Sequence, residues 1–194
     1  TKHGANKGAH AVIRKQIAIA TKECLLHEGI FCALVSHGSS TVPQYIVKEI
    51  NALGGTITNA YGIPKDQLKE VSKLGIAKIN VDTDIRLAVT RNLRELFWYH
   101  PELRDHESIK PIYELLQTKT SDFDPRVFLT PIMDTVMYGV VPNEDVALIV
   151  TAIEKGVKEA VGTLIVDFDS YGKAPLVENV TLDEMAERYR KAGI

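Results

Sequence analysis

The hydrophobic positions in the first half of the chain follow two alternating patterns. Stretches in which apolar residues recur at helical spacing are separated by short, continuous apolar runs typical of buried strands. Glycine and proline mark where these stretches begin or end, as at Gly29, Pro43 and Gly75. The predicted order is helix 9–28, strand 30–35, helix 43–53, helix 65–73, strand 76–81 and helix 84–98.

The second half of the chain shows a different pattern, with helical spacing and no convincing strand after residue 99. Helices are predicted near 109–119, 127–138, 144–160 and 182–191, and Thr181 with Glu184 forms a capping-box pattern at the start of the last one. The run 163–168 is apolar and strand-like but ambiguous. Strands alternating with helices indicate an α/β protein with a parallel sheet and crossover helices. Two strands alone are too few to form such a sheet stably.

Composition narrows the classes of partner. The chain has 23 basic and 25 acidic residues, a net charge of −2, which argues against nucleic acid or an anionic membrane as a partner. No apolar run is long enough for a membrane span, and the first residues lack a signal-peptide pattern, so we expect a cytoplasmic protein. Cys24 and Cys32 lie in or beside apolar stretches, which favours buried free thiols in a reducing compartment.

Three short polar loops contain the residues best suited to catalysis or to binding a ligand. They are 1–8 (TKHGANKG), 37–43 (HGSSTVP) and 80–84 (NVDTD), and each is placed where a strand ends. Small residues let a backbone approach a phosphate closely, and the helix that follows directs its N–H groups toward the anion. The alternative is that these serines and threonines only cap helices. Capping is the better interpretation of 80–84 alone, whereas the two loops together favour a phosphate site.

His3 and His37 are the candidate metal ligands. Each precedes a glycine and each is expected at the end of a strand, on the same edge of the sheet. Imidazole suits zinc, and a catalytic zinc usually takes three protein ligands and an open position, so a third ligand must come from elsewhere. A loop histidine that only forms hydrogen bonds is the alternative. The remaining histidines are expected on the surface or in a solvated connection; they are His10, His27, His100 and His106.

Arg126 lies at the start of a predicted helix, directly after the segment 122–125 (DFDP). A cation is poorly matched to the positive end of a helix dipole, so a role other than stabilising its own helix is indicated. One alternative is a merely exposed arginine, and the other is an arginine offered to a phosphate on another surface. Lys7 could reach an anion in the same way.

Several segments of the chain resemble sequence motifs of the class II (zinc-dependent) fructose-1,6-bisphosphate aldolases. TKHGANKG resembles the T-S-H-G-A-Y-K-G segment of that family, HGSSTVPQ its H-G-S-S-x-V-P-Q region, and FDPRVFL its F-D-P-R-x-Y-L motif. The resemblance implies a (β/α)8 TIM barrel, of which this chain supplies only the last strands and helices plus a helical C-terminal extension. Residues 1–194 would form the carboxyl-terminal half of the barrel domain, with barrel units in 1–98, a variable connection at 99–121 and a helical region at 122–194.

The resemblance also implies a role for each candidate residue. His3 and His37 would bind Zn2+, and the backbone near Lys2, Gly4 and Gly38 would bind a monovalent cation (Na+ or K+). Arg126 would reach the active site of a neighbouring subunit, in a homodimer or larger homo-oligomer. Dihydroxyacetone phosphate would be held by a larger set, assisted by Lys7: Gly4, Gly38, Ser39, Ser40, Asn80, Val81, Asp82 and Thr83.

The implied activity is reversible cleavage of fructose 1,6-bisphosphate into two triose phosphates, as in glycolysis and gluconeogenesis. No carboxylate in the chain matches the catalytic base of the family, so the base is expected in the missing N-terminal half, on a separate chain or segment. Asn6 replaces the usual tyrosine, Lys2 a small residue, and the segment 162–174 a shorter glycine- and serine-rich one. Alternatives are an aldolase for sedoheptulose or tagatose bisphosphate, or a non-catalytic phosphate-binding fragment.

Overall fold

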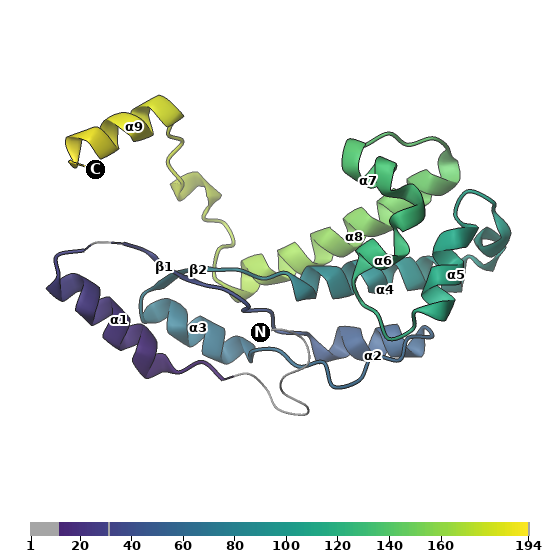
Figure 1. Cartoon of the computed structure of the whole chain (residues 1–194), viewed down its shortest axis with the longest axis horizontal. Coiled ribbons are helices and arrows are strands. Elements are labelled where there is room, and N and C mark those ends of the chain that lie inside the picture. Colours follow the sequence, from purple (N-terminus) through teal and green to yellow (C-terminus); the bar gives the residue numbers. More distant parts are fainter. Residues whose placement is uncertain (1–11, 31, 194) are drawn as a thin grey trace.

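The computed structural model describes residues 12–30 and 32–193 (Figure 1). The predicted loop 1–8, with His3, Gly4 and Lys7, and the start of the first predicted helix lie outside the described residues. The strands are β1 (Leu34–Ser36) and β2 (Ile76–Ile79). The α-helices are α1 (Lys15–His27), α2 (Gln44–Ala52), α3 (Lys65–Lys73), α4 (Thr83–Tyr99), α5 (Lys110–Thr118), α6 (Pro125–Phe128), α7 (Met133–Tyr138), α8 (Glu144–Asp167) and α9 (Leu182–Lys191), and short 3-10 helices are η1 (Pro101–Asp105), η2 (Thr130–Ile132) and η3 (Ala174–Leu176).

The two strands pair in parallel, as the alternation of elements predicts. Leu34 lies opposite Ile76 and Ser36 opposite Ile79, with an irregularity between Leu34 and Val35. Because parallel strands need a crossover, the chain passes through α2 and α3 between them. No residue of either strand is fully buried, so this sheet is covered far less than parallel sheets usually are. Helices make up most of the rest of the described chain.

Helices α4 and α8 form the axis of the molecule and run antiparallel, side by side (Figure 1). Gly156 of α8 lies directly against the backbone of α4. A Cβ atom at this position would lie 2.7 Å from the Cα of Val89 and 2.8 Å from the carbonyl oxygen of Ala88, both on α4. The missing side chain therefore allows the two backbones to pack directly against each other.

We expect Gly156→Ala to lower the free energy of unfolding by roughly 1–3 kcal/mol, because the added methyl group meets backbone atoms that cannot rotate away. Gly162→Ala is the matched control on the same helix, since its Cβ would meet nothing within 4 Å. The control should be neutral or stabilising, because alanine favours a helix by about 1 kcal/mol over glycine. Chemical denaturation measures both variants. Equal effects would contradict the close packing of α4 and α8.

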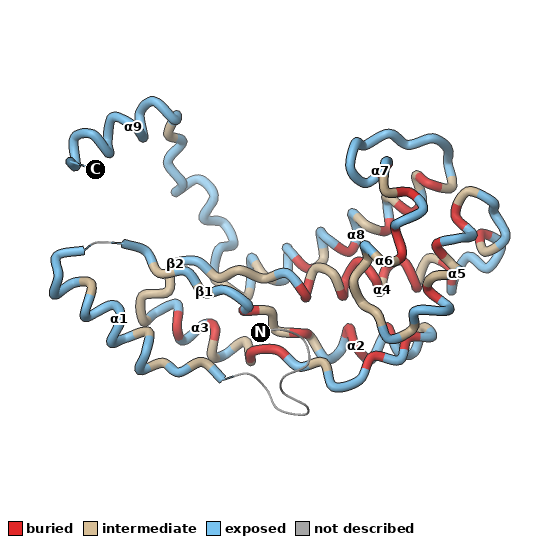
Figure 2. The backbone as a smooth tube through the Cα atoms, in the orientation of Figure 1, coloured by how far each residue is buried: buried red, intermediate tan, exposed pale blue. Residues whose placement is uncertain are grey.

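Buried residues gather along α2, α4, α5 and α8, while α1 has no buried residue (Figure 2). One hydrophobic cluster joins α4, α5, α6 and α8, and a second joins α2 to α4 and α8. Such clusters bury enough apolar surface to hold these helices together. The core is therefore helical and lies beside the sheet rather than on its two faces. Helix α9 stands apart from the rest (Figure 1).

Arg94 of α4 is buried between these clusters and is 3% exposed. Its guanidinium donates to the carbonyl oxygens of Leu53, at the end of α2, and Leu116, near the end of α5, at 3.5 and 3.0 Å. It also lies over the ring of Phe128, 6.0 Å from its centre. Burial lowers the pKa of Arg94. The positive charge of Arg94 lies at the negative C-terminal ends of α2 and α5, so its hydrogen bonds help to hold these two helices against α4.

Several predicted elements are confirmed, one is wrong, and one ambiguous run is resolved. Helix 65–73 agrees with α3 residue for residue, and no strand occurs among the described residues after 99. The single helix predicted over 127–138 is instead α6, η2 and α7, because Pro131 has no N–H to continue a helix. The ambiguous run 163–168 continues α8 to Asp167, which Phe168 caps. The strong β propensity of this run is overridden by the helix that leads into it.

The expectation of buried thiols is wrong. Cys24 and Cys32 are both free, as predicted, but both are exposed. Cys24 lies on α1, which no other element covers closely enough to bury a residue. The apolar context of a cysteine therefore did not indicate burial. Among the described residues, no helix combines the length and the apolar character needed to cross a membrane.

Candidate functional site

The carboxyl ends of β1 and β2 bring the loops 37–43 and 80–83 together. The Asn80 N–H donates to the Ser36 carbonyl at 2.9 Å, and the Ser39 N–H donates to the Asn80 carbonyl at 3.3 Å. These bonds continue the pairing of the two strands into the loops that follow them. The predicted convergence of the two loops at one edge of the sheet is present in the structure.

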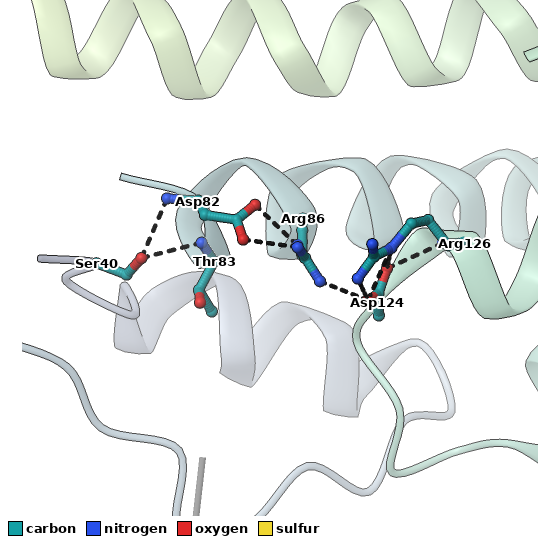
Figure 3. Close-up of polar contacts among 6 residues, drawn as sticks. All are labelled: Ser40, Asp82, Thr83, Arg86, Asp124 and Arg126. Atoms are coloured by element: carbon teal, nitrogen blue, oxygen red, sulfur yellow. Dashed lines mark hydrogen bonds and ion pairs between the residues drawn. The ribbon is translucent and has the colours of Figure 1, made fainter. Parts of the chain in front are cut away.

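Ser40 closes the first turn of α4 (Figure 3). Its Oγ accepts hydrogen bonds from the N–H groups of Asp82 and Thr83, at 3.2 and 3.0 Å. Asp82 occupies the N-cap position of α4, and its own side chain makes no cap hydrogen bond. Ser40 thus caps the helix across the loop, with an oxygen placed where an anion at a helix N-terminus would bind. A phosphate oxygen could replace this hydroxyl on the same two donors.

The other candidates of the two loops differ in how accessible they are. Ser39 is 0% exposed, and its hydroxyl lies 2.6 Å from that of Ser36. Thr83 is also buried, Val81 is half-buried, and Gly38 adopts a left-handed φ of 65°, which glycine tolerates at no steric cost. Ser39 therefore supports the loop from inside, whereas Ser40 faces the N–H groups at the start of α4.

Asp84 is a site residue that the sequence did not reveal as one. Its carboxylate is 4% exposed and accepts from the Thr41 N–H at 2.9 Å, the Thr41 hydroxyl at 2.6 Å and the Val42 N–H at 2.9 Å. A buried carboxylate requires such donors. Through these bonds the start of α4 fixes the loop that contains His37, Gly38 and Ser40.

The loop fixed by Asp84 contains backbone strain. Val42 has a φ of 51°, and a β-branched residue rarely adopts this left-handed conformation. Such a conformation costs on the order of 1–3 kcal/mol and persists only where the surroundings impose it. The Asp84 carboxylate on the Val42 N–H and the burial of the Val42 side chain impose it here. The loop is therefore held in one conformation.

His37 is exposed at the carboxyl end of β1, and its Nδ1 lies 3.0 Å from the Asn80 side-chain nitrogen. After a rotation of the amide, the Asn80 side-chain oxygen could accept a hydrogen bond from Nδ1–H of His37, and this contact would leave Nε2 as a ligand atom. Within the described part of the chain, no group of three or more His, Cys, Asp or Glu side chains could hold a metal ion. A zinc at His37 therefore needs ligands from outside these residues, and the predicted second ligand, His3, lies outside them.

An array of alternating charges extends from the loop 80–83 to Arg126 (Figure 3). The Arg86 guanidinium contacts both carboxylate oxygens of Asp82, at 2.8 and 2.6 Å, and its NH1 donates to Asp124. Asp124 also accepts from Arg126, through Nε at 3.0 Å. Two carboxylates and two guanidiniums lie together, so the array carries no net charge.

The hydrogen bond from Arg126 lowers the pKa of Asp124, and Asp124 in turn raises the pKa of Arg126. Asp124 is the N-cap residue of α6, so its carboxylate offsets the poor match between the Arg126 charge and the helix dipole. The Arg126 side chain remains 68% exposed. Arg126 is therefore anchored on one edge of its guanidinium and open to solvent elsewhere.

The other predicted positions lie away from this site. His27 and His100 are exposed, and His106 is not simply solvated, because its Nδ1 lies 2.9 Å from Asp145. A cavity of about 300 Å3 lies next to α7 and reaches Thr130, whose hydroxyl donates to the Arg126 carbonyl oxygen at 3.0 Å. It contains none of the candidate residues and is lined by Ser108, Thr130, Pro131, Ile132, Met133, Asp134, Thr135, Pro142, Asn143 and Val146.

The two site residues that the sequence did not indicate, Asp84 and Arg86, both contact residues that lie far away along the chain. Asp84 contacts Thr41 and Val42, more than forty positions away, and Arg86 contacts Asp124, 38 positions away. In the sequence both resemble ordinary charged residues in the first turns of a helix. The one available signal was their position, since Asp84 is the last residue of the predicted loop 80–84 and Arg86 lies two positions after it.

Comparison with known proteins identifies the family. A sequence profile described as "Fructose-bisphosphate aldolase class-II" matches residues 1–173. A protein of Xanthobacter flavus named "Fructose-bisphosphate aldolase" is 31% identical over 189 residues, covering 97% of this chain and 42% of that protein. "Fructose-bisphosphate aldolase 2" of Cereibacter sphaeroides is 30% identical over 194 residues, covering 100% of this chain and 44% of that protein.

A protein of Thermus caldophilus, also named "Fructose-bisphosphate aldolase", is 36% identical over 136 residues, which cover 70% of this chain and 37% of that protein. The chain thus spans less than half the length of the relatives it matches. The profile covers most of the chain, including both loops of the site and the segment with Arg126. The chain belongs to the class II fructose-bisphosphate aldolase family.

Proposed function

We propose that this chain is the carboxyl-terminal half of a (β/α)8 barrel aldolase that cleaves fructose 1,6-bisphosphate reversibly into dihydroxyacetone phosphate and glyceraldehyde 3-phosphate. The observation that carries the proposal is the convergence of the loops 37–43 and 80–83 on the N–H groups at the start of α4. Active sites and phosphate sites of such barrels lie at this end of the strands. Membership of the aldolase family supports the same conclusion.

The proposed phosphate site binds the triose phosphate common to both directions of the reaction. The N–H groups of Asp82 and Thr83 now donate to the Ser40 hydroxyl. When the Ser40 side chain rotates away from them, both groups can donate to phosphate oxygens, and the hydroxyl can donate to the phosphate as well. Asp84 keeps the loop rigid, so binding costs little ordering of the chain. The full proposed set adds Gly4, Lys7, Gly38, Ser39, Asn80 and Val81.

The metal in this proposal is Zn2+, held by His3, His37 and a ligand from the other half of the barrel. When bound, zinc supplies Lewis-acid polarisation of the substrate carbonyl. Asn80 orients the His37 ring through its contact with Nδ1. The backbone near Gly38 contributes to a site for a monovalent cation, Na+ or K+. The base that moves the proton between carbon and oxygen belongs to the other half, because no carboxylate in this chain matches it.

Arg126 is proposed to bind the distal phosphate of the sugar in a neighbouring subunit, within a homodimer or larger homo-oligomer. Its exposure and its planar guanidinium support the role, since such a group binds a phosphate through two parallel hydrogen bonds. Asp124 holds Nε and NH2 of Arg126, which leaves the NH1 side of the guanidinium directed away from Asp124. The distal phosphate would approach this open side.

A completion assay tests the proposal. Residues 1–194 alone should not cleave fructose 1,6-bisphosphate, because the third zinc ligand and the base are absent from them. Mixing with a chain that supplies the remaining strands of the barrel should produce cleavage that a chelator abolishes and zinc restores. The added chain alone is the control. Cleavage by residues 1–194 alone would contradict the division of the site. A higher kcat/KM for sedoheptulose or tagatose bisphosphate would change the substrate but not the mechanism.

A further inference from the structure

Arg86 is the centre of the charged array, and the phosphate and metal roles discussed above do not involve it. It is the fourth residue of α4, its side chain is 27% exposed, and it lies between two carboxylates from different segments. Asp82 belongs to the proposed phosphate loop, whereas Asp124 belongs to the segment that carries Arg126. One planar side chain therefore connects the two segments that would bind the two phosphates.

We propose that Arg86 is a positioning residue for phosphate binding: it fixes Asp82 and Asp124 in one neutral array, so that neither carboxylate repels the incoming anion. The inference rests on the proposed function of the loop 80–83. Arg86 donates from Nε and NH2 to Asp82 and from NH1 to Asp124, and only an arginine has donors arranged for both contacts at once.

The electrostatic reason lies in the position of Asp82. Its side chain is 68% exposed, and its own N–H is one of the two donors proposed for the phosphate. Without Arg86, an unpaired carboxylate would stand within a few ångströms of a bound phosphate. At this range, and at a dielectric between those of a protein surface and water, the added repulsion weakens binding about tenfold.

The fold does not depend on Arg86 for the placement of this segment. The buried hydroxyl of Thr90 donates to the Phe123 carbonyl at 2.9 Å, which ties the segment to α4 one turn further along. Phe128 and Leu129, which follow it, lie in the hydrophobic core. Removing Arg86 should therefore change the charge beside the phosphate loop while leaving the chain folded. A positioning role can thus be separated from a structural one.

The test is titration of dihydroxyacetone phosphate into the completed enzyme of the completion assay at low salt, with calorimetric detection. Arg86→Gln should weaken binding about tenfold, and about 0.5 M salt should reduce this difference to roughly threefold or less, because salt screens exposed charges. Arg86→Lys keeps the charge and should stay within about threefold of the wild type. Arg188→Gln is the matched control: it removes an arginine charge paired with Glu178 near α9, and it should leave the affinity unchanged.

Each result decides between explanations. Affinity of Arg86→Gln within about twofold of the wild type at low salt would overturn the inference and leave the proposed function intact, as would equal losses in Arg86→Gln and Arg86→Lys. A loss matched by a lower denaturation midpoint, and insensitive to salt, would assign Arg86 a structural role instead. If the completed wild-type enzyme binds no dihydroxyacetone phosphate, the proposed phosphate loop is wrong and the inference is overturned with it.

Discussion

Replacing His37 by alanine in the completed enzyme should abolish both aldolase activity and stoichiometric zinc. A catalytic zinc is usually held by three protein ligands, and two ligands hold it poorly. His37 stands at the carboxyl end of β1, exposed and oriented by Asn80, as a ligand from this strand should be. Metal analysis after gel filtration and a cleavage assay on the same sample measure the two losses together.

The control for this substitution is another exposed histidine. The Nδ1 of His27 lies 3.4 Å from the carboxylate of its neighbour Glu28, and the His27 side chain is 86% exposed. His27→Ala should therefore keep both zinc and activity. Full zinc occupancy in His37→Ala would show that the ligand is a different residue. Zinc loss accompanied by unfolding, measured by circular dichroism, would indicate a structural effect of the substitution.

The second large effect is expected at Asp84. Asp84→Ala should lower the free energy of unfolding by roughly 3 kcal/mol, because it leaves the buried N–H of Val42 and the partly buried N–H of Thr41 without this acceptor. It also removes one of the contacts that hold the strained backbone of Val42. The loop 37–43 should then lose its fixed conformation. Binding of dihydroxyacetone phosphate should weaken at the same time. Chemical denaturation and calorimetric titration measure the two effects.

Asp66→Ala provides a matched control for Asp84→Ala. Both residues are acidic and lie second in their helices, Asp66 in α3 and Asp84 in α4. Asp66 is exposed, so its replacement removes only a favourable contact with the helix dipole, worth about 0.3–1 kcal/mol. If Asp84→Ala costs no more than Asp66→Ala, then the carboxylate does not hold the loop.

The elements that sequence reasoning predicted well are those whose signals are local. Pro64 and Gly75 bound helix 65–73, and the capping box of Thr181 and Glu184 begins α9 as expected. The parallel pairing of β1 and β2 also followed, because the alternation of strand and helix leaves few other topologies. Where a local rule was not applied, at Pro131, the predicted helix was wrong. The exposure of Cys24 depends on what covers α1, which its local sequence does not specify.

The candidate site was also predicted only where its signals are local in the sequence. The convergence of the two loops follows from the ends of parallel strands, which always meet at one edge. The contacts of Asp84 with Thr41 and of Arg86 with Asp124 do not follow, because each joins positions about forty residues apart. Propensity and spacing describe neighbours along a helix or strand. The roles of His3, His37 and Arg126 stay predictions.

The two-stranded sheet has a consequence for how such a chain behaves during synthesis. Within the described residues, β1 and β2 each pair on one side only, and the other side presents unpaired N–H and C=O groups. Val35 on β1 adds an apolar side chain that is 42% exposed. A bare strand edge of this kind is a template for any extended segment, including a second copy of itself. In the proposed barrel a further strand would cover this edge, and aggregation would compete with the pairing of that strand.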